Sequence, residues 1–139
     1  MTTRGWRRLA EILRTQDTPP VELALGLYTT LWGGWLALPW FDTFPASPAY
    51  AGLQALAPEP VWGCGILVLG FGQLYALLWL HQRLRLCLLF AHAGLWTFIA
   101  LSTFVASGGT AAGVPHFILM ALAAAWSFTR QPRGLRRRR

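Results

Sequence analysis

The sequence contains little charge for its length and no lysine. Charged residues make up 12% of the 139 residues, whereas about 25% is usual in a soluble domain. All twelve basic residues are arginines, set against five acidic residues, and the formal net charge is +7. Hydrophobic residues make up 55% of the chain, too much apolar surface for a disordered protein. This composition indicates a small integral membrane protein.

Sequence motifs for catalysis, disulfide formation and metal binding are also missing. Cys64 and Cys87 form no CxxC motif, and they lie near opposite ends of two apolar segments, too far apart for a disulfide. The three histidines, His81, His92 and His116, are spread too widely along the chain for a three-histidine metal site. The sequence has no Ser/His/acid grouping, glycine-rich phosphate loop or paired carboxylate. It therefore predicts no enzyme activity, catalytic residue, metal or cofactor.

Four long apolar segments are present, covering residues 21–41, 61–80, 86–105 and 113–128. A helix needs about 20 mainly apolar residues to cross a hydrocarbon core ~30 Å thick. In lipid, every backbone polar group must be bonded internally, which favours helices. The expected fold is all-α: a polytopic membrane protein with a four-transmembrane-helix bundle, forming a single domain over residues 19–129. A soluble helical bundle is the less favoured alternative.

Shorter segments flank these four. Residues 1–18 form a cytoplasmic amphipathic segment, with arginines around one face and apolar side chains on the other, so we expect it to lie in the membrane interface. In the first loop, Ser47 can cap a second short interfacial helix that opens at Pro48 and ends before Pro58. Its residues expected to face lipid are Tyr50, Leu53 and Leu56 or Ala57. Residues 130–139 form a basic cytoplasmic tail.

The arginines fall on one side of the predicted spans. They precede the first span, occupy the turn between the second and third, and follow the fourth, while the loop over residues 42–60 has two acids and no base. The positive-inside rule makes the arginine side cytoplasmic and places both termini there. We therefore expect a multi-pass protein of the bacterial inner membrane. We expect the arginines to set the topology and to contact anionic lipid head groups, and we do not expect them to bind nucleic acid. The arginines assigned these roles are Arg4, Arg7, Arg8, Arg14, Arg83, Arg85, Arg130, Arg136, Arg137, Arg138 and Arg139.

A stripe of small residues follows the second segment, formed by Gly63, Gly65, Gly70 and Gly72. Glycines seven residues apart leave a smooth helix face that another helix can approach closely. Within one bundle, that helix is the first segment, whose Gly26, Gly33 and Gly34 could face the stripe. The alternative is contact between protomers of a homo-oligomer or with a larger membrane complex.

Polar residues share one layer in the cytoplasmic half of the predicted spans: Thr29, Thr30, Gln73 and His92. Polar side chains at this depth are costly, which makes them informative. A hydrogen-bonded cluster that fixes helix register, with Gln73 bonded to His92, is the simpler interpretation. The functional alternative is a patch that lines an aqueous path. Glu22, in the first turn of the first segment, is expected to interact with the positive end of the helix dipole.

Three stretches carry a resemblance to a known group of proteins: ALGLYTTLWGGWLALPWFDTFPASPAY, LAPEPVWG and QRLRLCLLFAHAGLWTFIAL. They resemble small four-span membrane proteins found in bacteriophage and prophage genomes. The group has no established activity, so the resemblance transfers no functional residue.

The resemblance favours a holin-like pore former, because holins are small, contain several spans, assemble laterally and often end in a charged cytoplasmic tail. In that hypothesis the polar layer faces the lumen. The alternatives are a structural or regulatory membrane subunit, such as a scaffold or a superinfection-exclusion factor, and a small transporter.

Overall fold

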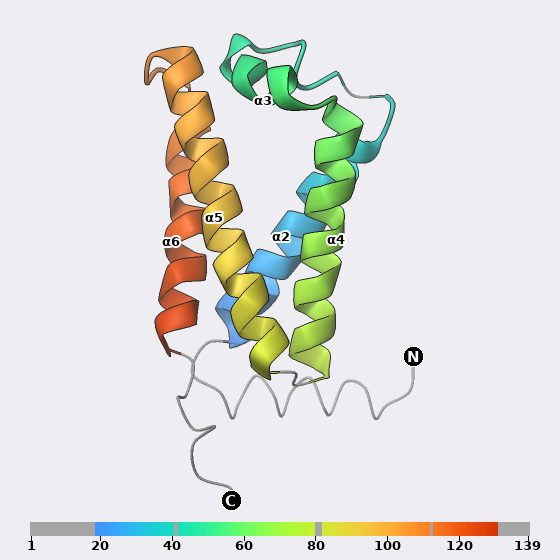
Figure 1. Ribbon diagram of the computed structural model, residues 1–139, viewed down its shortest axis with the longest axis vertical. Helices are drawn as coiled ribbons and strands as arrows, with labels where there is room; N and C mark the ends of the chain where they lie inside the picture. Colours follow the sequence, from blue (N-terminus) through green and yellow to red (C-terminus); the bar gives the residue numbers. More distant parts are fainter. Residues whose placement is uncertain (1–18, 41, 80–81, 112, 131–139) are drawn as a thin grey trace, which may run out of the picture.

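The computed structural model describes residues 19–40, 42–79, 82–111 and 113–130, and within these ranges every regular element is a helix (Figure 1). The long helices are α2 (Pro19–Ala37), α4 (Glu59–Leu78), α5 (Gln82–Ser107) and α6 (Val114–Arg130). Two short elements, η1 (Pro48–Tyr50) and α3 (Ala51–Leu56), lie between α2 and α4. The expected all-α fold is confirmed. The amphipathic segment over residues 1–18 and the tail beyond residue 130 lie outside the described residues.

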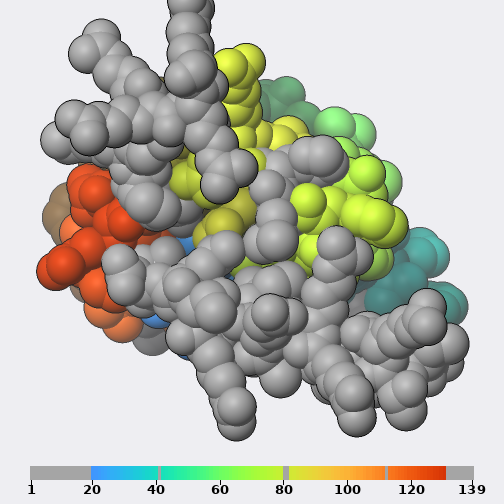
Figure 2. All heavy atoms as spheres, turned by 90° about the horizontal axis from the view of Figure 1, so that it is seen from below, coloured from blue at the N-terminus to red at the C-terminus, as the bar shows by residue number. Residues whose placement is uncertain are grey.

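The four long helices form a bundle in which α2 packs along α4 and α5 packs along α6. Seen from the lower end, α6 and α4 lie on opposite sides, with the beginning of α5 between them (Figure 2). Helices α2 and α5 both begin at this lower end and run in the same direction (Figure 1). They face each other across the interior of the bundle, where side chains rather than backbones bridge them.

Two described helices, α4 and α5, are long and apolar enough to cross a membrane, with 20 and 26 residues. Helices α2 and α6 have 19 and 17 residues and are not in that class. Each of the four predicted apolar segments corresponds to one of the four long helices. A bundle in which all four helices cross a membrane stays a prediction.

The glycine stripe divides between two faces of α4. A Cβ atom added to Gly63 or Gly70 would lie closer than 3.0 Å to the backbone of α2, and one added to Gly33 would lie equally close to the backbone of α4. These three positions therefore let α2 and α4 approach more closely than any larger side chain would permit. A Cβ atom at Gly72 would meet the side chain of Leu88 at 3.5 Å, and one at Gly65 would meet nothing within 4 Å.

At the upper end, the chain between α2 and α4 folds over the bundle as a cap. The carboxylate of Glu59, at the start of α4, accepts hydrogen bonds from the backbone N–H groups of Thr43 (3.1 Å) and Phe44 (2.9 Å). Ser47 caps η1, its hydroxyl accepting a bond from the backbone N–H of Ala49 at 3.4 Å. These bonds fix the loop to the helix that follows it.

The cap also corrects one expectation about the loop. Leu53 is 1% exposed and belongs to the hydrophobic core, so the prediction that it faces lipid is wrong. The indole N–H of Trp62 donates to the carbonyl oxygen of Leu53 at 3.0 Å, which holds this face of α3 against the bundle. Tyr50 stacks on Phe44 with ring centroids 5.3 Å apart, and burial, followed by the charge of Glu59, raises the pKa of Tyr50.

The two faces of α4 predict different responses to the same substitution. Gly70→Leu should force α2 and α4 apart and lower the free energy of unfolding by about 1–3 kcal/mol, because two of the three nearest atoms are backbone atoms of Thr30. Gly65→Leu is the matched control and should change stability by less than about 0.5 kcal/mol. Reversible unfolding of the purified protein by SDS in micelles measures both. Equal losses in the two variants would show that the α2–α4 contact is misassigned.

Candidate functional site: a buried polar cluster

An ion pair lies inside the lower end of the bundle, between the first turn of α2 and the first turn of α5. Arg85 Nη2 donates to Glu22 Oε1 at 2.7 Å, and Arg85 Nε donates to Glu22 Oε2 at 2.9 Å. The two side chains are 2% and 0% exposed. Paired, parallel bonds of this kind are among the strongest hydrogen bonds between charged groups. We refer to Glu22 and Arg85 below as the ion pair.

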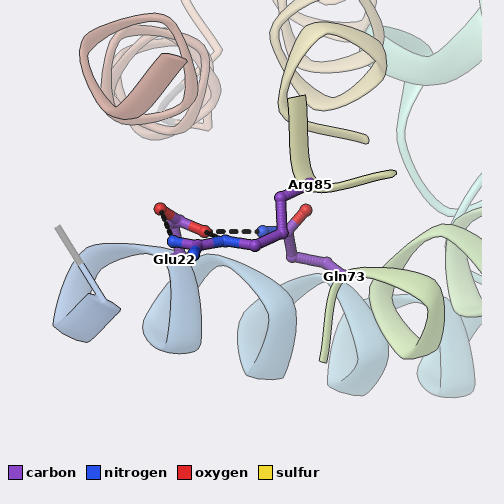
Figure 3. Close-up of polar contacts among 3 residues, drawn as sticks. All are labelled: Glu22, Gln73 and Arg85. Carbon is purple, nitrogen blue, oxygen red and sulfur yellow. Dashed lines mark hydrogen bonds and ion pairs between the residues drawn. The ribbon is translucent and has the colours of Figure 1, made fainter. Parts of the chain in front are cut away.

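Gln73, from α4, joins the ion pair. Its side-chain Nε2 donates to Glu22 Oε2 at 3.2 Å, so this carboxylate oxygen accepts bonds from two helices (Figure 3). Three helices, α2, α4 and α5, therefore meet at one carboxylate.

Glu22 and Arg85 thus have roles that the sequence did not predict. The sequence predicts that Glu22 interacts with the positive end of the helix dipole and that Arg85 contacts lipid head groups. The second expectation is wrong, because Arg85 is 2% exposed. Arg85 lies on the face of α5 that also buries Leu89 and His92, while Arg83, two residues earlier, is exposed. A helix turns by about 100° per residue, so neighbouring arginines can have opposite surroundings.

The other arginines assigned to topology and lipid are distributed as follows. Arg83 and Arg130 are exposed near the lower end, and the guanidinium of Arg130 lies 5.6 Å from the ring centroid of Trp126. The remainder lie outside the described residues: Arg4, Arg7, Arg8, Arg14, Arg136, Arg137, Arg138 and Arg139.

The predicted polar layer is brought together only in part. Thr29, Gln73 and His92 are all 0% exposed. Thr30 is partly buried and its hydroxyl donates to the carbonyl oxygen of Gly26 at 2.8 Å, within its own helix. The expected bond between Gln73 and His92 is wrong, because Gln73 donates to Glu22 instead.

His92 is oriented by its own helix. Its Nδ1 lies 2.8 Å from the carbonyl oxygen of Leu88. A carbonyl can only accept, so Nδ1 carries the proton in this contact, and a neutral ring then leaves Nε2 as an acceptor. This acceptor atom is buried and has no hydrogen-bond partner within the described residues.

Several buried polar atoms have no hydrogen-bond partner within the described part of the chain. They are Thr29 Oγ1, Gln73 Oε1, His92 Nε2, Trp96 Nε1 and Ser127 Oγ. They come from all four long helices. Native proteins leave few buried polar groups unpaired, so a concentration of them in one interior needs an explanation.

One of these atoms, Trp96 Nε1, belongs to an aromatic cluster. Trp96 is fully buried, and its ring centroid lies 5.4 Å from that of Tyr28, 5.3 Å from that of Trp32 and 5.7 Å from that of Phe117. His116 extends the cluster, with its ring 4.7 Å from that of Tyr28. The polar interior is therefore bounded by the ion pair below and by packed rings above.

Cys64 and Cys87 are free thiols, both exposed. Among the described residues, no group of three or more His, Cys, Asp and Glu side chains is placed to hold a metal ion. No protein-family model, curated protein or solved structure matches the chain. The site is therefore interpreted from its own geometry.

Because the ion pair is buried, we expect a single substitution to destabilise the protein much more than a double substitution that removes both charges. Arg85→Met should lower the free energy of unfolding by about 3–5 kcal/mol, because it leaves a buried carboxylate without its counter-ion. The double variant Glu22→Gln/Arg85→Met should recover most of that loss, since the new amide is uncharged and still accepts from Gln73. SDS unfolding in micelles measures both, with the exposed Arg83→Met as the control. A double variant as unstable as the single one would contradict a buried charge pair.

Proposed function

We propose that the chain is a four-span protein of the bacterial inner membrane that acts as a structural or regulatory subunit and not as a pore. The observation that carries the proposal is the burial of the polar layer. Thr29, Gln73 and His92 are 0% exposed, so the side chains that a water-filled path between protomers would need are turned into the protomer itself.

The surface of the bundle supports membrane insertion of all four helices. Large apolar side chains are exposed not only on α4 and α5 but also on α2 and α6, among them Leu27, Leu31, Ile118, Leu119 and Leu122. Soluble monomers rarely expose contiguous apolar surface on this scale. The exposed charged side chains of the described residues are Asp42, Arg83 and Arg130, which lie at or just beyond the ends of helices and not along their middle. Acyl chains are the surroundings that this distribution suits.

Charge supports the expected orientation. Arg83 and Arg130 lie at the lower end of the bundle, where α2 and α5 begin, whereas Asp42 follows the upper end of α2. With the lower end in the cytoplasm, the positive-inside rule is satisfied and both termini are cytoplasmic.

Both ends of the bundle are closed in this arrangement. The cap buries Phe44 and Leu53 over the upper end, and the ion pair crosses the lower end. A holin-like pore with Gln73 and His92 facing the lumen would require breaking the bond between Gln73 and Glu22 and turning α5 outward. A scaffold or a superinfection-exclusion factor, by contrast, requires only a stable surface presented to a partner.

A homo-oligomer or a larger membrane complex remains part of the proposal. Gly63 and Gly70 already contact α2, so they are not available to a partner. Gly65 lines an apolar groove of about 420 Å³ between α4 and α5, together with Trp62 and Ala91. Assembly through the glycine stripe would therefore involve Gly65.

Topology can be tested by labelling single cysteines with a membrane-impermeant maleimide in a variant that lacks Cys64 and Cys87. Ala46→Cys and Thr110→Cys, both at exposed positions, should react from outside the inner membrane. Leu84→Cys, between α4 and the body of α5, should react only after the membrane is opened. Labelling of Leu84→Cys in intact spheroplasts would invert the proposed orientation.

Dye release tests the choice between subunit and pore. Liposomes that contain the purified wild-type protein should retain an entrapped dye at every protein density, because Thr29, Gln73 and His92 do not reach the surface. Gln73→Leu should leave this result unchanged. Release by the wild type that Gln73→Leu abolishes, with insertion intact, would overturn the proposal and favour the holin-like pore or the transporter.

A further inference from the structure

Side-chain contacts fix the relative height of α2 and α5, which run in the same direction (Figure 1). The ion pair joins them near the lower end. Higher up, Trp32 and Trp96, ten and eleven residues beyond the members of the ion pair, lie 5.3 Å apart between ring centroids. Thr29 and His92, each seven residues beyond the ion pair, therefore lie at one level between these two contacts. A rise of 1.5 Å per residue places that level about 10 Å above the ion pair.

Short side chains occupy this level, whereas larger ones fill the interior on either side of it. Below, Leu25 and Leu89 are buried, and above, the indole rings of Trp32 and Trp96 meet. Thr29 is therefore smaller than the side chains that lie below and above it in this part of the interior.

Two other helices contribute polar atoms near the same level. A Cβ atom added to Gly26 would lie 3.4 Å from Cγ of Gln73, which places Gln73 one turn below Thr29. On α6, the ring of Phe128 lies 6.4 Å from that of Phe90, so Ser127 lies beside the turn of α5 that precedes His92. All four of these polar side chains are 0% exposed.

We propose that these four side chains form a closed hydration site, which binds one or more ordered water molecules in the centre of the bundle. Gln73 Oε1 and His92 Nε2 are buried acceptors, and neither has a donor within the described residues. A water molecule donates two hydrogen bonds and can satisfy both. It also accepts bonds from the hydroxyls of Thr29 and Ser127, which makes four bonds in all, within the range of about two to four that buried waters make.

The charge of the site restricts the ligand to an uncharged molecule. Glu22 and Arg85 neutralise each other within the lower layer, and no other acidic or basic side chain of the described residues is buried next to the site. The enclosing residues are packed rings and leucines, so the molecule is small. Water meets both conditions.

The hydration site completes a network that joins all four long helices. Gln73 donates to Glu22 through Nε2 and accepts from the site through Oε1, so it connects the ion pair to Thr29, His92 and Ser127. This inference does not depend on the proposed function, because it rests only on buried atoms within one protomer.

Thr29→Val tests the site, because valine keeps the shape of threonine and removes only the hydroxyl. If water is bound, the ratio of folded to unfolded protein in SDS should fall about fivefold, as expected for one lost hydrogen bond. Ser127→Ala should act in the same direction. If the layer is dry, removing an unpaired hydroxyl should leave the ratio unchanged or raise it, and this outcome would overturn the proposal.

A second measurement separates bound water from a direct contact between Thr29 and His92. In protein labelled with ¹⁵N-histidine in lipid bilayers, magnetisation should pass from water to the His92 ring, and Thr29→Val should reduce the transfer. Thr30→Val is the control, because its hydroxyl already bonds to Gly26 and lies outside the site, and it should leave the His92 signal unchanged. Absence of transfer to His92 in the wild type would overturn the proposal even if Thr29→Val is destabilising.

Discussion

The ion pair between Glu22 and Arg85 is the constraint on which the arrangement of the helices depends. Removing either charge from water costs several kcal/mol, so the pair is tolerated only while both bonds are made. Sliding or rotating α2 against α5 would separate the charges and leave each one buried alone. The ion pair thus selects one register for two helices that are linked only through side chains, a contribution to specificity more than to stability.

The remaining contacts follow from that register. Gly33, Gly63 and Gly70 allow α2 to approach α4 until their backbones touch, which brings Gln73 within reach of Glu22. At the other end, Glu59 holds the cap through backbone N–H groups. One buried carboxylate therefore organises the lower end of the bundle and a second organises the upper end, and the polar layer is enclosed between them.

Much of this fold follows from local features of the sequence. The apolar segments became helices, Ser47 capped η1 as expected, and the glycines of the first and second segments face each other at Gly33 and at Gly63 and Gly70. The wrong predictions concern the direction in which side chains point. Leu53 faces the core, and Gln73 bonds to Glu22 rather than to His92. Whether a side chain points inward depends on how its helix is rotated, which local sequence does not specify.

The sequence by itself determined the helices, because the length of each apolar run and the positions of proline and glycine set where a helix can begin and end. It also determined that Glu22 and Arg85 begin their helices at the same end of the bundle. Only the tertiary structure decided that they meet, while Arg83, two residues away, stays exposed. The reason is geometric: about 200° of helix rotation separates the two arginines, and the packing of α5 against its neighbours chooses which of them is buried.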